Sequence, residues 1–320
     1  MSEALCLAVY GLLVAVVGPA VIRRVTCGRT AAPRWGIALW VSALLSTVGA
    51  WVGAVVLFGH ALTGSEVVRH VARRCVDAVC AAALGAHGSP TRWAVLTAFT
   101  AIAVGVLVAG VRGVGALCRT RRRTLAHAYA ARMVGRFDRR LGIVVVDAPE
   151  RLVYSVAGRP SAIVVSEPAL AALTDQQLQA VLAHERAHLA GRHHLLLGGA
   201  RALATAMPGL PLFTACAAEL GRLVEMCADD AAARQHDGRA LVTALLAIAG
   251  PPPPRQALAA AASAVTERAG RLLSAASVGR TVTERTASAL LTAGLLAGPI
   301  LAVALATVGI AWCGDLLLSL

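Results

Sequence analysis

The sequence contains no lysine, and only 15% of its 320 residues are charged and 4% aromatic. Soluble globular chains are roughly one quarter charged and about half apolar, whereas 58% of this chain is hydrophobic. So little charge excludes a disordered chain and a coiled coil, and it argues against an ordinary soluble enzyme. The composition favours a protein with membrane-spanning segments, and the length leaves room for one domain beside them.

All 30 basic residues are arginine, and they give the chain a formal net charge of +13. On a soluble protein such an excess would indicate nucleic-acid binding. Here the arginines cluster beside apolar segments, as the positive-inside rule predicts for membrane proteins, and aromatic side chains are too few for a base-stacking surface. We therefore expect the lipid bilayer, and no nucleic acid, as a partner.

The eight cysteines form no paired C-x-x-C motifs, so nothing supports a zinc ribbon or a disulfide scaffold. Several lie in apolar runs, where cysteine behaves as a small hydrophobic residue. Only Cys75 and Cys80 share one polar loop, and they are the candidates for a disulfide.

Four apolar segments without a charge are long enough to cross a bilayer, which takes about 20 residues each. They are Ala4–Ile22, Gly36–Phe58, Trp93–Val111 and Ala287–Trp312. The first does not resemble a secretory signal, because Glu3 and no arginine precedes it. We predict a multi-pass protein of the cell membrane with four transmembrane helices.

The distribution of arginine predicts the orientation of these spans. The densest cluster, Arg112 to Arg123, directly follows the third span, whereas the N-terminus and the C-terminal tail contain no arginine. Arginine-rich flanks mark the cytoplasmic side of a membrane. We therefore expect the segment between the third and fourth spans in the cytoplasm and both termini outside.

That segment is the only one long enough to hold a domain between the spans. The predicted division is a three-span membrane region at 1–119, a cytoplasmic catalytic domain at 120–286, and the fourth transmembrane helix with a short tail at 287–320. The patterns predict a helix at Leu125–Leu141, strands at Ile143–Val146 and Ser161–Ser166, a helix at Gln177–Ala190 and membrane-adjacent packing of Leu195–Ala218. The helix at Gln177–Ala190 follows a capping box, Thr174-Asp175-Gln176-Gln177.

This capped helix contains the motif H-E-x-x-H, formed by His184, Glu185 and His188. Residues four apart lie on one face of a helix, so both imidazoles can bind one Zn²⁺. Glu185 would face the open coordination position as general base for a zinc-activated water. A five-residue match also arises by chance, but the capping box, the strands and an acidic partner downstream favour a zinc site with one Zn²⁺ per chain.

The third zinc ligand is expected from a later helix. Glu225 would bind the metal, and Asp229 would accept a hydrogen bond from the outer nitrogen of a ligand histidine and orient its ring. The alternative is that both acids belong to an ordinary solvated helix face, offset by Arg222 and Arg234.

A second alternative uses a different third ligand. Residues His184 to His194 also fit H-E-x-x-H-x-x-G-x-x-H, the metzincin pattern, with Gly191 at the turn and His194 as ligand. Met207 would then belong to the Met-turn. The simpler explanation is a helix that ends with basic residues at its negative pole.

Three apolar spans, an H-E-x-x-H domain and a fourth span resemble the BlaR/MecR-type integral membrane zinc metallopeptidases, gluzincins related to the HtpX-like membrane proteases. The resemblance covers essentially the whole chain. Its most specific parts are Ala157-Gly158, Ile163-Val164-Val165, Leu173 to Leu178, Val181 to His188 and Glu225-x-x-Ala228-Asp229. One departure is His193, near which family members often have an acid. Another is that only Cys313 to Leu320 follow the fourth span, so we expect no penicillin-binding sensor domain there.

The resemblance implies a mainly α membrane protein with a zincin-like α+β catalytic domain inserted between the third and fourth spans. It implies His184, His188 and Glu225 as zinc ligands and Glu185 as general base. It also implies that Ser161, Ala162, Ile163, Val164 and Val165 form an edge strand beside which the substrate peptide binds by strand addition.

Together these features predict a membrane-bound zinc metalloendopeptidase that acts on a protein or peptide substrate. A cytoplasmic repressor is one substrate that would suit it, which would make the reaction a step of regulatory proteolysis. The competing class is a non-catalytic membrane signal-transducing protein with a structural zinc site. Glu185 favours catalysis, because a structural site does not require that carboxylate.

Overall fold

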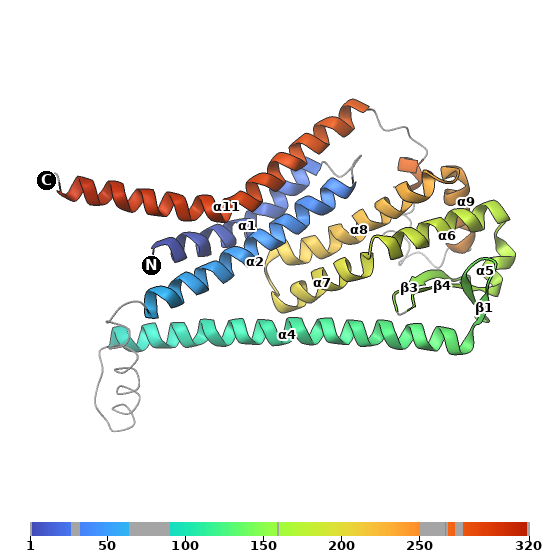
Figure 1. The fold of residues 1–320 in the computed structure, drawn as a ribbon, viewed down its shortest axis with the longest axis horizontal. Coiled ribbons are helices and arrows are strands. Elements are labelled where there is room, and N and C mark those ends of the chain that lie inside the picture. The colour runs from blue at the N-terminus through green and yellow to red at the C-terminus, as the bar shows by residue number, and fades with distance from the viewer. Residues whose placement is uncertain are drawn as a thin grey trace, which may run out of the picture.

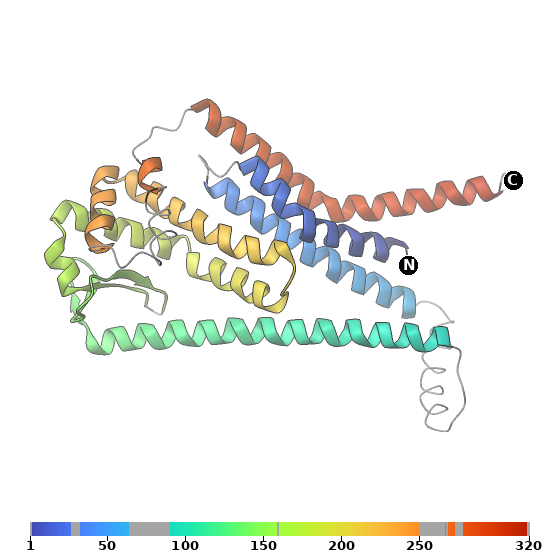
Figure 2. The ribbon, with the colours of Figure 1, turned by 180° about the vertical axis from the view of Figure 1, so that it is seen from behind.

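The computed structural model describes residues 2–26, 33–63, 90–158, 160–249, 266, 268–272 and 278–318. The molecule is elongated and mainly helical, with a small sheet near one end (Figure 1). Both ends of the chain lie on the side away from the sheet, with the end of the last helix extending beyond the start of the first, as both views show (Figures 1 and 2). The predicted pair Cys75 and Cys80 lies outside the described residues.

Three long helices contain segments that are long and apolar enough to cross a membrane. The helices are α1 (Ser2–Thr26), α2 (Pro33–Thr63) and α11 (Val278–Leu318). The apolar segments are Cys6–Val25, Pro33–Leu57 and Arg285–Leu305. They confirm helices of suitable length at three of the four predicted spans. Many of their large apolar side chains face outward, with Leu305 72% exposed, and such an apolar surface requires a non-aqueous partner.

The three helices pack against one another and share a polar contact inside the bundle. The Tyr10 hydroxyl from α1 lies 2.8 Å from Ser46 Oγ on α2 and donates to the Leu295 carbonyl on α11 at 3.1 Å. In an apolar environment such polar groups are stable only when they are paired. This contact therefore ties the three helices together.

Helix α4 (Pro90–Val134) is 45 residues long and runs along the whole molecule (Figure 1). At 1.5 Å per residue its length is about 68 Å. The predicted third span, Trp93–Val111, lies in the part of α4 where almost no side chains are described, so it stays a prediction. The helix continues unbroken through residues 119 and 120, where the sequence predicts the start of the catalytic domain.

The helix predicted over Leu125–Leu141 is too long, because α4 ends at Val134. A Cβ at Gly135 would meet the Val144 side chain and two backbone carbonyls, so a glycine is needed where α4 approaches the sheet. After it the chain forms strand β1 (Arg136–Asp138), which pairs antiparallel with strand β2 (Ile143–Val146).

The sheet contains four described strands in the order β1-β2-β4-β3. Strands β3 (Val153–Val156) and β4 (Ala162–Ser166) complete it, and β4 runs parallel to β2 and antiparallel to β3. The strands predicted at Ile143–Val146 and Ser161–Ser166 are confirmed, the second starting one residue later. Strands β1 and β3 were not predicted.

The expectation that Ser161–Val165 forms the edge strand is wrong. Ser161 precedes β4, and Val164 of β4 pairs with Val144 of β2 on one side and with Tyr154 of β3 on the other. Residues 162–165 are all buried in this interior strand. The chain after β2 folds back to place β3 outside β4, so β3 is the edge of the described sheet on this side.

Five helices follow the sheet within the described residues up to Ala249. They are α5 (Glu167–Ala172), α6 (Asp175–Ala190), α7 (His193–Ala206), α8 (Pro211–Ala233) and α9 (Gly238–Ala249). The predicted capping box is confirmed: Gln177 N–H donates to Thr174 Oγ1, and Thr174 N–H donates to Gln177 Oε1 at 2.9 Å. Helix α6 packs between the sheet and α9, with Val181 and Leu182 in a shared core.

Helices α7 and α8 form a hairpin that packs against the long apolar helices. Leu212, Phe213 and Leu220 of α8 are buried in one cluster with Leu39 and Trp40 of α2. Helix α7 packs on α4, and α8 also contacts α1. The hairpin predicted to be membrane-adjacent thus joins the sheet end of the molecule to the candidate membrane helices.

Candidate metal centre

Two histidines of α6 approach each other on one face of the helix. The capping box sets where α6 begins, and the buried residues Leu178, Val181 and Leu182 set which face meets the core. Further along the same helix, His184 is buried and His188 is half-buried. Their Nε2 atoms lie 3.1 Å apart, as the i, i+4 spacing allows.

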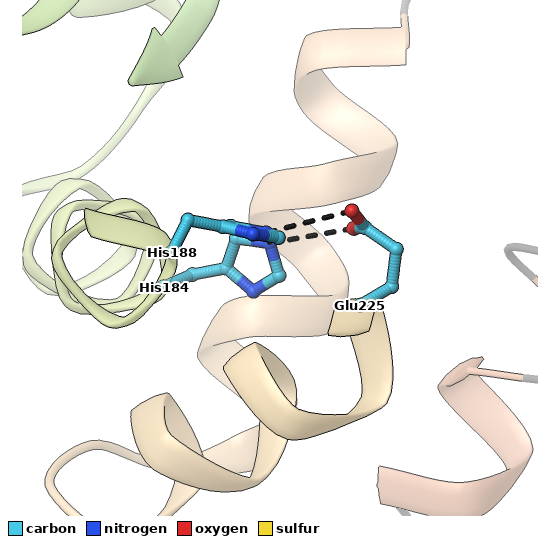
Figure 3. A group of neighbouring side chains, drawn as sticks. All are labelled: His184, His188 and Glu225. Carbon is cyan, nitrogen blue, oxygen red and sulfur yellow. Dashed lines mark hydrogen bonds and ion pairs between the residues drawn. The ribbon is translucent and has the colours of Figure 1, made fainter. Parts of the chain in front are cut away.

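Glu225 of α8 completes the group, as Figure 3 shows. Its carboxylate oxygens lie 3.5 Å from His184 Nε2 and 3.5 Å from His188 Nε2. The three side chains come from two helices that pack directly against each other. One ligand atom from each residue lies within 4.8 Å of the others, and this is the group that the described residues offer for a metal ion.

The spacing of these donors fits a zinc ion. Bonds of about 2.0–2.1 Å in a tetrahedral site place the donor atoms about 3.3 Å from one another. The three contacts between the donors measure 3.1, 3.5 and 3.5 Å. Two imidazoles and one carboxylate leave a fourth position open, which is the donor set of catalytic rather than structural zinc sites.

Asp229 lies behind His184, one helical turn after Glu225. Its Oδ1 atom is 3.1 Å from His184 Nδ1, and the side chain is fully buried. Burial alone would raise the pKa of Asp229, but hydrogen bonds to Arg268 and His184 hold it at about 2. The carboxylate is therefore charged and can orient the His184 ring from its outer nitrogen.

Arg268 is a residue of this centre that the sequence reasoning missed. Its guanidinium donates to both oxygens of Asp229, at 2.8 and 2.6 Å, and lies 3.2 Å from Glu225 Oε2. Three residues on, Arg271 donates to Asp230 at 2.6 Å and to the Met226 carbonyl. The sequence signal for this pairing is weak: two arginines three residues apart, Arg268 and Arg271, match two adjacent acids, Asp229 and Asp230.

His193 lies behind the second histidine. Its Nδ1 atom is 2.9 Å from His188 Nδ1, and the residue is buried at the start of α7. If His188 presents a free Nε2 to a metal, its proton is on Nδ1, and His193 Nδ1 is the acceptor. A Cβ at Gly191 would meet the His193 ring, so this approach also needs a glycine. The sequence places His193 in a basic helix end, at a departure from the family pattern, and predicts no role for it at the metal.

Removal of the His193 ring should weaken zinc binding. We expect His193→Ala to lower zinc affinity by about 10–100-fold, the usual cost of losing the partner of a ligand histidine. His193→Asp should bind zinc at least as tightly as the wild type, because a carboxylate accepts the same hydrogen bond with the help of its charge. Zinc competition with a chromogenic chelator measures both. Unchanged affinity in His193→Ala would show that His188 is oriented without it.

His194 points elsewhere. It is exposed and lines a cavity beside α4, whereas Glu225 lies next to His184 and His188. The described geometry therefore favours the gluzincin arrangement over the metzincin one.

The general-base candidate Glu185 lies beside the edge strand. Burial raises the pKa of Glu185, and hydrogen bonds with the side chain and backbone of Ser155 on β3 oppose part of that rise. A carboxylate whose pKa is moved toward neutrality is a better proton acceptor for catalysis.

The two histidines of this group, His184 and His188, differ in their affinity for protons. Burial lowers the pKa of His184, but hydrogen bonds to Asp229 and Glu225 outweigh it and raise the pKa to about 9. Burial lowers the pKa of His188. Since histidine ligates a metal as the neutral ring, a metal that binds here must displace the proton of His184.

Residues 121–207 match the model of peptidase family M48. No curated protein and no solved structure matches the chain. The matched stretch contains the end of α4, the sheet, α5, α6 and α7, and it ends before Glu225 and Asp229. Peptidases of this family are zinc-dependent, so the match supports a metallopeptidase domain around the two histidines. It is a match to the family as a whole and not to the BlaR/MecR-type branch.

Proposed function

We propose that this protein is a membrane-bound zinc metalloendopeptidase. The observation that carries the proposal is the His184, His188 and Glu225 group, whose donor spacing fits zinc and whose two histidines lie within the segment that matches peptidase family M48. Three helices long and apolar enough to cross a membrane support attachment to the bilayer.

His184, His188 and Glu225 would hold the metal, and Asp229 and His193 would orient the two rings from behind. A bound Zn²⁺ supplies a Lewis acid that polarises the peptide carbonyl and lowers the pKa of water. Glu185 accepts a proton from the attacking water and returns one to the leaving amine. Its position beside Ser155 places this proton transfer next to the edge strand β3.

Strand β3 takes the substrate-binding role that the sequence predicts for Ser161–Val165. In the described sheet its inner side pairs with β4 and its outer side has no strand partner. An extended peptide can add to such an edge through main-chain hydrogen bonds, which hold it in register without requiring one sequence. The peptide bond opposite Ser155 would then lie close to Glu185.

Metal content and peptide cleavage test this function together. Protein purified in mild detergent should contain about one zinc per chain and cleave a denatured protein, and a chelator should abolish cleavage until zinc is restored. The competing class, a signalling protein with a structural zinc, predicts bound zinc without cleavage. Protein that binds no zinc would contradict both.

We further propose that the catalytic end is cytoplasmic and that both termini are outside. The arginines from Arg112 to Arg123 on α4 support this, because translocating them next to a span is unfavourable. The N-terminal end of α1 and the C-terminal end of α11 both lie away from the sheet, which supports one side for both termini (Figure 2).

Fusions to a reporter that is active only in the cytoplasm test the orientation. We expect a fusion after Arg140 to be active and a fusion after Leu320 to be silent. Active reporters at both positions would place both on the cytoplasmic side and so indicate an even number of spans, or none, between them. A silent reporter after Arg140 with an active one after Leu320 would indicate an inverted protein.

A catalytic domain in the cytoplasm would act on a cytoplasmic protein. If that substrate is a repressor, its cleavage is a step of regulatory proteolysis. Cells that express Glu185→Gln should accumulate the uncleaved substrate, and it should co-purify with the variant. Mass spectrometry of the captured proteins, compared with His184→Ala as a metal-free control, identifies it.

A further inference from the structure

A cavity of about 780 Å³ lies between α4, the turn from β3 to β4, and the junction of α6 and α7. Figure 1 shows these elements converging where the sheet faces α4. Binding pockets of drug-sized ligands measure about 300–1,000 Å³, so this space accommodates several side chains of a peptide.

The cavity begins where the elements of the metal centre end. Leu189 in its wall follows the ligand His188, and Ala157 follows the last residue of the edge strand β3. His194 follows His193, whose ring contacts His188. A peptide that lies along β3 past Glu185 therefore continues directly into this cavity.

Among the described residues that line the cavity, the charged side chains are arginines: Arg121 and Arg132 from α4 and Arg192 from the turn before α7. None of these described lining residues carries a carboxylate. Arg132 donates to the carbonyls of Pro160 and Ser161 and so fastens the β3–β4 turn to α4. Arg121 and Arg192 are exposed, and they line the cavity from two different elements, α4 and the turn before α7.

His194 also lines the cavity, beside Arg192. Burial and the nearby charge of Arg192 lower the pKa of His194. Apolar side chains between the arginines, Leu117, Leu125 and Leu195, are exposed to the cavity. A complementary ligand is therefore extended, partly apolar and negatively charged.

Arg192 adopts a left-handed backbone conformation with φ of 49°. This conformation is strained for residues other than glycine, whereas glycine adopts it without strain. Replacement of this arginine by glycine removes the charge and relieves the strain together. It thus offers a variant whose loss of binding cannot be ascribed to lost stability.

We propose that this cavity is a substrate subsite that binds an acidic, partly apolar stretch of the peptide beside the scissile bond. The assignment rests on the proposed peptidase function. Arginine binds carboxylates through paired hydrogen bonds, and two exposed arginines that line one cavity can hold one or two acidic side chains. The protein would then cleave next to acidic sequences in preference to neutral or basic ones.

Cleavage of a synthetic peptide library with randomised positions tests the preference. The full-length protein in detergent is incubated with the library, and mass spectrometry reads the cleavage sites. We expect aspartate and glutamate to be enriched on one side of the cleaved bond. A cleaved peptide and its amide analogue, with glutamine for glutamate, then give kcat/KM values for each variant.

Arg121→Gln with Arg192→Gln should lower kcat/KM for the acidic peptide roughly fivefold to tenfold and leave the amide analogue unchanged. Arg192→Gly should show part of this loss with a melting temperature no lower than that of the wild type. Arg121→Glu with Arg192→Glu should reverse the preference toward basic peptides. The matched control is Arg123→Gln with Arg139→Gln, two exposed arginines outside the cavity, and it should behave like the wild type.

Cleavage without acidic enrichment, or enrichment that survives charge reversal, would overturn the subsite and leave the peptidase function standing. No cleavage of any peptide would instead contradict the proposed function. If the double glutamine variant lost binding to phosphatidylglycerol vesicles but kept its peptide preference, the arginines would serve a lipid surface and the subsite would be rejected.

Discussion

Glu185→Gln is expected to lower kcat/KM by roughly 10²–10⁴-fold, the usual contribution of a general acid–base group. The amide has nearly the same shape as the carboxylate but cannot accept a proton. Glu185 does not belong to the His184, His188 and Glu225 group, so zinc content should remain at the wild-type level. Cleavage kinetics and metal analysis of the same preparation measure both effects.

The pH dependence gives a second measurement on this variant. Glu185 acts as a base only when ionised, and burial raises the pKa of Glu185 above that of an ordinary glutamate. Wild-type kcat/KM should therefore fall on the acidic side at a higher pH than for an exposed carboxylate. Glu185→Gln should lack that step, because it has no group to protonate there.

Glu167→Gln is the matched control, since Glu167 is an exposed acid in the first turn of α5. It should keep full activity and zinc. Near-normal activity in Glu185→Gln would show that another group accepts the proton. Loss of zinc in that variant would show that Glu185 supports the metal site rather than the chemistry.

The parts of the site that the sequence predicts are those set by local rules. A capping box starts α6, and the helical repeat alone brings His184 and His188 to one face. The long apolar runs likewise predict α1, α2 and α11 without any knowledge of their packing. In each case the signal lies within a single element.

The edge strand was mispredicted because strand order depends on distant pairing. Residues 162–165 form an apolar run buried along its whole length, which is typical of a strand covered on both faces and flanked by others. Strand β3, with Tyr154 and Ser155 at its centre, is more polar and only partly buried. That contrast in the sequence favours residues 153–156 over residues 162–165 as the edge strand.

Arg268 was missed for a related reason. It pairs with Asp229 across 39 residues of sequence, and no spacing rule connects two helices that meet only in the folded protein. His193 was missed because its partner is defined by the turn at Gly191 and Arg192 and not by a helical repeat. The turn that brings it to His188 uses a left-handed residue, which periodicity does not predict.

The second large effect is expected from Glu225→Ala, which should lower zinc affinity by more than about 100-fold. Loss of a residue that only orients a ligand costs about 10–100-fold, and loss of a ligand itself should cost more. Activity should be lost with the metal. Glu225 contributes the only carboxylate of the group, and both of its oxygens lie 3.5 Å from an imidazole nitrogen. Two neutral imidazoles alone are a weak zinc site.

The zinc affinities of His194→Ala and Asp229→Asn, compared with that of Glu225→Ala, test which residue is the third zinc ligand. His194→Ala should keep zinc and the chemical step, because His194 lies in the cavity wall and not in the metal-binding group. Asp229→Asn should weaken zinc by about 10–100-fold, since the amide still reaches His184 Nδ1 but no longer carries the charge that Arg268 and His184 stabilise. The metzincin arrangement predicts the reverse order for Glu225 and His194. Tight zinc in Glu225→Ala with metal lost in His194→Ala would therefore move the third ligand from α8 to the start of α7.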